Sequence, residues 1–319
     1  MRFDLDDQQR DFASSIDGRL GASDVPAAVR AWSDGDTGPG RKVWTALAEL
    51  GVTALTVSEE FDGIDAHPVD LVVAAERLGY WGVPGPVTES IAVAPVLLAG
   101  DERSAALASG DLVATVAMPP HVPRAVDADF AGVVLFAADG TVCDGTAGDL
   151  HASVDPARRL FDVTASGEAW NADTARAFEF GALTTAALLV GAGQAMLDAS
   201  VEYAKQRTQF GRVIGSYQAI KHKLADVYIA VELARPLVYG AALSLADGSP
   251  ETARDVSAAK AAASDAALLS ARSSLQAHGA IGFTEEHDLS LLLLRVQALR
   301  SAWGDPTWHR ARVLEALTV

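Results

Sequence analysis

Residues 203–218 include an arginine, glutamines and a phenylalanine that could bind a diphosphate joined to an aromatic ring. Arg207 is expected to close a long helix, residues 208–211 to form a loop, and a new helix to begin near Val213. A guanidinium beside the free amides of a helix start favours phosphate, and Phe210 offers a flat face for a ring. The alternative is that Arg207 pairs with an acidic surface and Phe210 is core, and the spacing alone favours this alternative.

A second candidate, Gly191-Ala192-Gly193, resembles the start of a dinucleotide-binding loop. Met196 stands where the third glycine should be, and the preceding segment is predicted to be a helix rather than a strand. We therefore expect these small residues to let helices approach closely. The sequence has no P-loop, zinc-binding helix motif or nucleophile elbow. Its one cysteine, Cys143, excludes an internal disulfide and a cysteine-based zinc site, and no metal site is predicted.

The composition indicates a globular, acidic protein. Half of its 319 residues are hydrophobic, and 25 basic residues against 42 acidic ones give a net charge of −17. Such a surface repels nucleic acid and anionic lipid. The N-terminus is acidic without an apolar stretch, and the longest apolar run, Ala182–Gly193, is too short to cross a bilayer. We expect a cytoplasmic protein that binds neither nucleic acid nor membrane.

The elements that must position these residues fall into three regions. Residues 1–108 are predicted to be a helical domain, residues 109–169 a small β domain with an Asp139-Gly140 hairpin, and residues 170–319 a bundle of four long helices. The expected helices are Asp6–Leu20, Trp44–Leu50, Val69–Leu78, Phe178–Arg207, Val213–Leu245, Ser249–His278 and Glu285–Arg300, and the expected strands are Leu112–Met118, Gly132–Ala137 and Thr141–Cys143.

The motifs of the chain resemble those of the acyl-CoA dehydrogenase family, in order and over nearly its whole length. The most specific are Tyr-x-x-x-Arg-x-Gln-Phe-Gly-x-x-Ile at 203–214, His-x-Leu-Ala-Asp at 222–226, and the Gln-x-x-Gly-Gly-x-Gly-Phe-Thr pattern at 276–284. Further matches lie at 47–52, 57–63, 76–79 and 86–89. The resemblance implies the same order of helical domain, β domain and four-helix bundle, hence a mainly α fold with a small β domain.

The resemblance also implies an FAD cofactor that lies across a subunit interface, with the bundle of one chain contacting the flavin held mainly by its neighbour. One departure is Ala280, where the family usually has glycine; a methyl group there narrows the approach of a ligand to the backbone. The residues that match the family's FAD contacts are Arg207, Gln209, Phe210, Gln218, Gln276, Gly279 and Ala280.

The family's chemistry needs a carboxylate that removes the α-proton of an acyl-CoA thioester, and the matching positions here lack one. The usual position, late in the chain, is Trp303, and the position used by a minority of members is Gly181. Glu179 and Asp305 lie two residues from these sites. Because two residues of helix correspond to about 200° of rotation, we expect them to face elsewhere. No catalytic residue is therefore assigned to this chain.

The predicted β domain is reduced as well. The family's Thr-x-Pro-x-x-Gly-Ser-Asp and Trp-x-Thr/Ser-Asn stretches, which cover the flavin ring, have no counterpart between Leu112 and Trp170. By resemblance, the chain is expected to be the shorter, base-lacking subunit of an α2β2 heterotetramer. A longer homologous subunit would supply the base, and a separate electron-transfer acceptor would reoxidise the flavin. A bulky steroid side-chain CoA is a plausible substrate of such an enzyme.

Two alternatives stay open at this point. The chain could form a self-sufficient homomeric dehydrogenase with an unusual base such as Glu179, or it could be an assembly subunit without flavin. Smaller signals are His278, which could contact a phosphate, Glu285-Glu286 as an acidic helix start, and Leu291–Leu294, which we expect to be buried in the bundle or in a subunit interface.

Overall fold

The structure is a computed structural model and describes residues 5–318. Its first part is helical, as predicted. Asp6 caps the first helix by accepting a hydrogen bond from the backbone N–H of Gln9. A helix at Val25–Ser33 was not predicted. The helices of this part are α1 (Asp7–Gly21), α2 (Val25–Ser33), α3 (Gly38–Glu49), α4 (Pro68–Trp81), α5 (Ala94–Leu97) and α6 (Arg103–Ser109).

A five-stranded sheet of order β1-β3-β4-β5-β2 follows. Asp139 and Gly140 both have positive φ and form the predicted hairpin, in which Ala138 pairs with Thr141. The third predicted strand extends far beyond Cys143, and the long strand after it was missed. The strands are β1 (Ala114–Ala117), β2 (Ala125–Val126), β3 (Val133–Ala138), β4 (Thr141–His151) and β5 (Leu160–Asn171).

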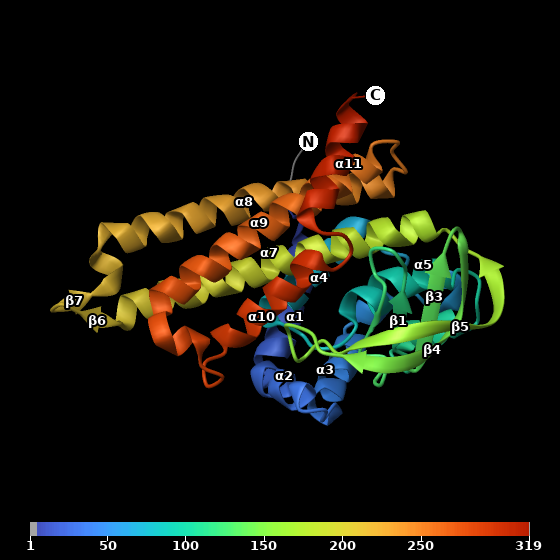
Figure 1. Cartoon of the computed structure of the whole chain (residues 1–319), viewed down its shortest axis with the longest axis horizontal. Coiled ribbons are helices and arrows are strands. Elements are labelled where there is room, and N and C mark those ends of the chain that lie inside the picture. Colours follow the sequence, from blue (N-terminus) through green and yellow to red (C-terminus); the bar gives the residue numbers. More distant parts are fainter. Residues whose placement is uncertain (1–4, 319) are drawn as a thin grey trace.

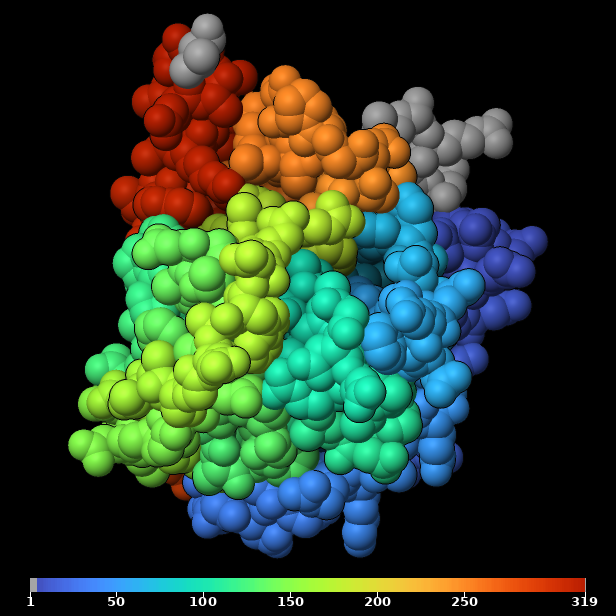
Figure 2. All heavy atoms as spheres, turned by 90° about the vertical axis from the view of Figure 1, so that its right-hand side faces the viewer, coloured from blue at the N-terminus to red at the C-terminus, as the bar shows by residue number. Residues whose placement is uncertain are grey.

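The last part is the predicted helical bundle, with one helix more than expected. Figure 1 shows its long helices side by side, with the sheet and the first helices packed against one half of their length. The helices are α7 (Thr174–Gln206), α8 (Gln218–Ala246), α9 (Thr252–His278), α10 (Leu289–Ser301) and the unpredicted α11 (Pro306–Thr318). In Figure 2 the green strands and the blue N-terminal helices form one continuous surface, with the red C-terminal helix above it.

Two predicted helix starts were wrong. Val213 belongs to a small hairpin of β6 (Thr208–Gln209) and β7 (Arg212–Val213), because Phe210 and Gly211 both take positive φ and turn the chain back. Glu285 and Glu286 precede α10 and lie outside it, so they are not an acidic helix start.

Helix α7 is the core of the bundle. Gly191 lies in its middle, where an added Cβ would overlap the backbone of Glu76 on α4, and Gly79 of α4 likewise touches the backbone of Leu188. The prediction that Gly191-Ala192-Gly193 serves close helix packing is therefore confirmed. Helices α7 and α8 are both long and apolar enough to cross a membrane, but 94% of the apolar window of α7 is buried within the fold.

Candidate functional site

Two segments far apart in the sequence meet at one end of the bundle, which we call the bundle tip: residues 203–218 and residues 276–284. The tip lies at the left of Figure 1, beside β6 and β7. The ring of Tyr203, at the end of α7, stacks on His278, at the end of α9, with centroids 4.3 Å apart. Lys223 of α8 donates a hydrogen bond from Nζ to Oε1 of Gln276 on α9. These contacts fix the two segments relative to each other.

The side chains at the bundle tip are bare. Phe210 is 94% exposed, so it is not core, and Arg207 has no carboxylate partner within residues 5–318. The structural alternative raised for both residues is therefore wrong. The predicted cofactor-binding residues all lie at this end of the molecule and are all exposed: Arg207, Gln209, Phe210, Gln218, Gln276, Gly279 and Ala280.

The bundle tip has the chemistry of a phosphate and aromatic-ring site. A free guanidinium beside a large bare ring is an unusual pair on the surface of a chain with net charge −17. Gly279 has a φ of +67°, a conformation that favours glycine, and it leaves the backbone open to a ligand. These residues therefore fit the adenosine-diphosphate half of a dinucleotide cofactor.

His278 lies beneath this surface. Its side chain is buried, and its Nδ1 is 2.8 Å from the backbone oxygen of Ser274. Because that oxygen can only accept, Nδ1 carries the proton. Burial lowers the pKa of His278, and the nearby His287 adds to this. His278 thus serves as a neutral stacking partner of Tyr203.

The two positions where the family carries its base meet in space, although they are far apart in sequence. The Trp303 side chain is fully buried, and its ring covers Gly181 so closely that an added Cβ at Gly181 would overlap it. The indole Nε1 donates to Oε1 of Glu89, 3.1 Å away. Glu89 follows α4 in an irregular helical turn and ends the family match at 86–89, but nothing in the sequence indicated its contact with Trp303.

Aromatic side chains extend this contact into a cluster. Phe178 of α7 lies 5.9 Å from the Trp303 ring and 5.5 Å from that of Trp308 on α11. His121 stacks 4.1 Å from Trp308. His121 belongs to the short loop after β1, in the place where the family's Thr-x-Pro-x-x-Gly-Ser-Asp stretch was expected and not found. We call His121, Phe178, Trp303 and Trp308 the aromatic plug.

The two neighbouring carboxylates have other partners. Glu179 is buried and forms an ion pair with Arg312 of α11, with Nη1 3.2 Å from Oε2. Asp305 accepts hydrogen bonds from the backbone N–H groups of Thr307 (2.7 Å) and Trp308 (3.1 Å) at the start of α11. These backbone bonds lower the pKa of Asp305. Both carboxylates thus secure α11.

Two buried basic side chains hold the turn that carries Trp303, whose own φ is +56°. Lys260 of α9 donates to the backbone oxygens of Arg300 (3.1 Å) and Gly304 (3.2 Å). Burial lowers the pKa of Lys260 to about 7. His309 Nε2 is 2.9 Å from the backbone oxygen of Trp303, and burial, with a contribution from Lys260, lowers its pKa to about 3. The indole is therefore held from its backbone as well as from Glu89.

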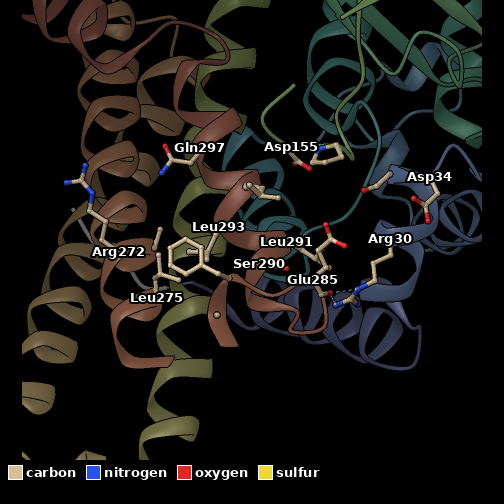
Figure 3. Close-up of a pocket in the computed structure, with 16 residues that line it drawn as sticks. Arg30, Asp34, Asp155, Arg272, Leu275, Glu285, Ser290, Leu291, Leu293 and Gln297 are labelled. Carbon is tan, nitrogen blue, oxygen red and sulfur yellow. Dashed lines mark hydrogen bonds between the residues drawn. The ribbon is translucent and has the colours of Figure 1, made fainter. Parts of the chain in front are cut away.

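A cavity of about 560 Å³ lies between α2, α9 and α10. Its wall includes Leu291, Leu293 and Leu294, which are half-buried and face this space (Figure 3). Arg30 at one side pairs with Asp288 at 2.7 Å, so its charge is compensated. Figure 3 shows the guanidinium of Arg272 directed away from Arg30. Arg272 has no ion-pair partner within residues 5–318, so the cavity differs from the bundle tip mainly in its leucine-rich wall.

Comparisons with known proteins agree with this architecture. Residues 6–106 match the model "Acyl-CoA dehydrogenase, N-terminal domain", and residues 170–318 match "Acyl-CoA dehydrogenase, C-terminal domain". The chain is 34% identical to acyl-CoA dehydrogenase IpdE2 of Mycobacterium tuberculosis over 283 residues, which covers 85% of each protein. It is also 34% identical to IpdE2 of Mycolicibacterium smegmatis, with 91% of this chain and 92% of the relative covered.

Solved structures share the fold at lower sequence identity. Butyryl-CoA dehydrogenase from Megasphaera elsdenii superposes with a TM-score of 0.84 at 21% identity, covering 100% of both chains. A chain of the ChsE4–ChsE5 complex from Mycobacterium tuberculosis gives 0.86 at 21% identity, covering 100% of this chain and 99% of the other. A chain of a Tcur3481–Tcur3483 steroid ACAD variant gives 0.86 at 18% identity, with 98% of each chain covered.

The fold and the bundle tip define a flavin-type oxidoreductase. The chain belongs to the acyl-CoA dehydrogenase family. FAD is the cofactor of this family, in agreement with the residues that the bundle tip presents.

Proposed function

We propose that this chain is the shorter, base-lacking subunit of a heteromeric, FAD-dependent acyl-CoA dehydrogenase. It contributes the interface half of an FAD site, while a longer homologous subunit contributes the flavin-ring cradle and the catalytic base. The assembly is an α2β2 heterotetramer in the cytoplasm. The observation that carries this proposal is the Trp303 ring seated on Gly181, because it places an indole where either form of the family's base would stand.

The bundle tip supports the first half of the proposal. Arg207 binds a phosphate of FAD, Phe210 and Gln209 lie on its adenine side, and Gln276, Gly279 and Ala280 bind from the second segment, with Gln218 beside them. All seven are exposed, so they act on a ligand that another surface must cover. An interface with a second subunit provides that cover, because a dinucleotide on an open surface stays solvated and dissociates easily.

The aromatic plug supports the second half. A proton acceptor must come within hydrogen-bond reach of the α-carbon of the substrate. An indole N–H cannot accept a proton, and the one on Trp303 is already given to Glu89. The carboxylates closest in sequence, Glu179 and Asp305, are bound to Arg312 and to the start of α11. The buried Glu89 accepts the indole N–H of Trp303, and these contacts together support a base that the partner supplies.

Bound FAD would supply a hydride acceptor for the β-hydrogen, and with loss of the α-proton to the base the acyl-CoA thioester would become an enoyl-CoA. This chain's residues hold the diphosphate and adenine and thereby orient the cofactor. An electron-transfer acceptor then takes the electrons.

A steroid side-chain CoA is the proposed substrate class. The structural neighbours include a protein described as a steroid ACAD and a two-component ChsE4–ChsE5 complex. A tetramer with half the usual number of catalytic sites leaves room for a wide substrate in each remaining site, and the aromatic plug of this chain is consistent with such a reduction.

Co-expression tests the proposal. The chain should be purified alone and together with candidate longer acyl-CoA dehydrogenases from the same organism, and FAD content and acyl-CoA oxidation should be measured for each. We expect FAD and turnover only in the complex. Stoichiometric FAD and turnover in the isolated chain would support the homomeric alternative, and a complex whose FAD content does not depend on this chain would support the assembly-subunit alternative.

A further inference from the structure

A lysine–glutamine contact links two helices at the bundle tip. Lys223 lies near the start of α8 and Gln276 near the end of α9, and Lys223 Nζ donates to Gln276 Oε1. The lysine is half-buried, whereas the glutamine is exposed. No carboxylate within residues 5–318 pairs with Lys223. The ammonium group is therefore committed to the glutamine.

This contact decides which end of the amide faces outward. An ammonium group only donates hydrogen bonds, so the glutamine must turn its oxygen toward Lys223. The NH₂ end of Gln276 then faces away from the lysine with two donors free. Without the lysine, the oxygen and nitrogen ends of an exposed amide are nearly equivalent, and the group samples both orientations.

We propose that Lys223 is a positioning residue for cofactor binding: it orients the Gln276 amide as a hydrogen-bond donor toward the adenosine-diphosphate half of FAD. This inference rests on the proposed function, in which Gln276 contacts the cofactor. The phosphate and ribose oxygens and the adenine ring nitrogens of that half are hydrogen-bond acceptors, and an amide that is already oriented loses less rotational freedom when it binds them. Lys223 thus affects FAD binding by orienting the Gln276 amide, and not only by the attraction between its charge and the phosphates.

The test measures FAD dissociation constants in the complex with the longer subunit. We expect Lys223→Met to weaken FAD binding about tenfold. Without the lysine the Gln276 amide is no longer oriented, and the expected loss is about the free energy of one hydrogen bond that involves a charged group. Lys223→Arg keeps a donor and should restore most of the affinity. The matched control is Lys221→Met, which removes the same charge from an exposed site two residues away on α8.

A double-mutant cycle with Gln276→Leu separates positioning from direct contact. We expect Lys223→Met to have no further effect once Gln276 is replaced. Fully additive losses, or a Lys223→Met loss no larger than that of Lys221→Met, would overturn the inference. Arg207→Ala distinguishes a wrong positioning role from a wrong proposed function. If Arg207→Ala loses FAD while Lys223→Met does not, the proposed function stands and only the positioning role of Lys223 is wrong.

A second measurement needs no partner. In the isolated chain labelled with ¹⁵N-glutamine, the side-chain amide signal of Gln276 should move when Lys223 is replaced by Met. An unchanged Gln276 amide would contradict the proposed contact directly.

Discussion

Helix α7 connects two regions with opposite character. At its C-terminal end, the bundle tip presents Arg207 and a 94% exposed Phe210 to the surroundings. In its first turns, Gly181 lies beneath the fully buried ring of Trp303. One region is charged, bare and suited to a ligand, and the other is aromatic and closed. The contrast teaches that one helix can connect a surface suited to a ligand with a packed aromatic cluster, and the proposed function assigns the missing proton acceptor to a second subunit.

The largest expected effect is on the closed region. Trp303→Ala should lower the free energy of unfolding by about 3–5 kcal/mol, because it removes a buried aromatic ring and leaves a cavity. Chemical denaturation of the isolated chain measures this. Trp303→Phe, which keeps most of the volume, is the matched control. If Trp303→Ala were nearly neutral, the plug would not be a packed core and the contrast with the tip would fail.

The reverse pattern is expected at the bundle tip. Arg207→Ala should weaken FAD binding to the complex by about 10- to 100-fold, the loss of a charge-assisted hydrogen bond to phosphate, while the stability of the chain hardly changes. FAD retention and thermal unfolding report the two quantities. Lys205→Ala is the control, since Lys205 is exposed and pairs with Glu202. Equal FAD loss in both variants would mean that the effect is one of general charge.

A pH dependence should mark the support beneath Trp303. The pKa of Lys260 is lowered in the folded chain to about 7, below its ordinary value of 10.5. The unfolded chain therefore binds more protons between these values, and stability should rise with pH across that window. From pH 7 to pH 9 this amounts to about 2 kcal/mol.

Lys260→Met should abolish that rise, whereas Lys221→Met should leave it intact. Denaturant unfolding at several pH values makes the measurement. A wild-type stability that stays flat or falls over this range would show that the two backbone oxygens around Lys260 keep it charged.

The smallest effect is expected at Glu179. Glu179→Gln should change the turnover of the complex by no more than about twofold, which corresponds to less than about 1 kcal/mol. The reason is that Glu179 pairs with Arg312 and does not touch the reacting atoms. Arg312→Gln removes the same ion pair and leaves the carboxylate of Glu179, so both variants should have the same turnover. Loss of activity in Glu179→Gln alone would identify a base in this chain and remove the distinction between the two regions.

Much of the fold was predictable because local patterns carry it. Helical periodicity placed α1, α4, α7 and α9 to within a few residues, and Asp139-Gly140 placed the β3–β4 hairpin. The errors arose at a short exposed turn and in a strand without a buried face. The β6–β7 hairpin replaced an expected helix start, and the long β5 mixes apolar and polar residues with none of them buried, so no alternation marks it as a strand.

The sequence by itself determined the order of helical, β and helical regions, the residues matching a flavin family, and the lack of a carboxylate at positions 181 and 303. Only the tertiary structure decided that these two positions touch, that Glu179 turns to Arg312, that Phe210 is bare, and that Lys223 reaches Gln276. The physical reason is that a residue's type and helical phase are local. Which side chain meets it across the core depends on how distant helices pack.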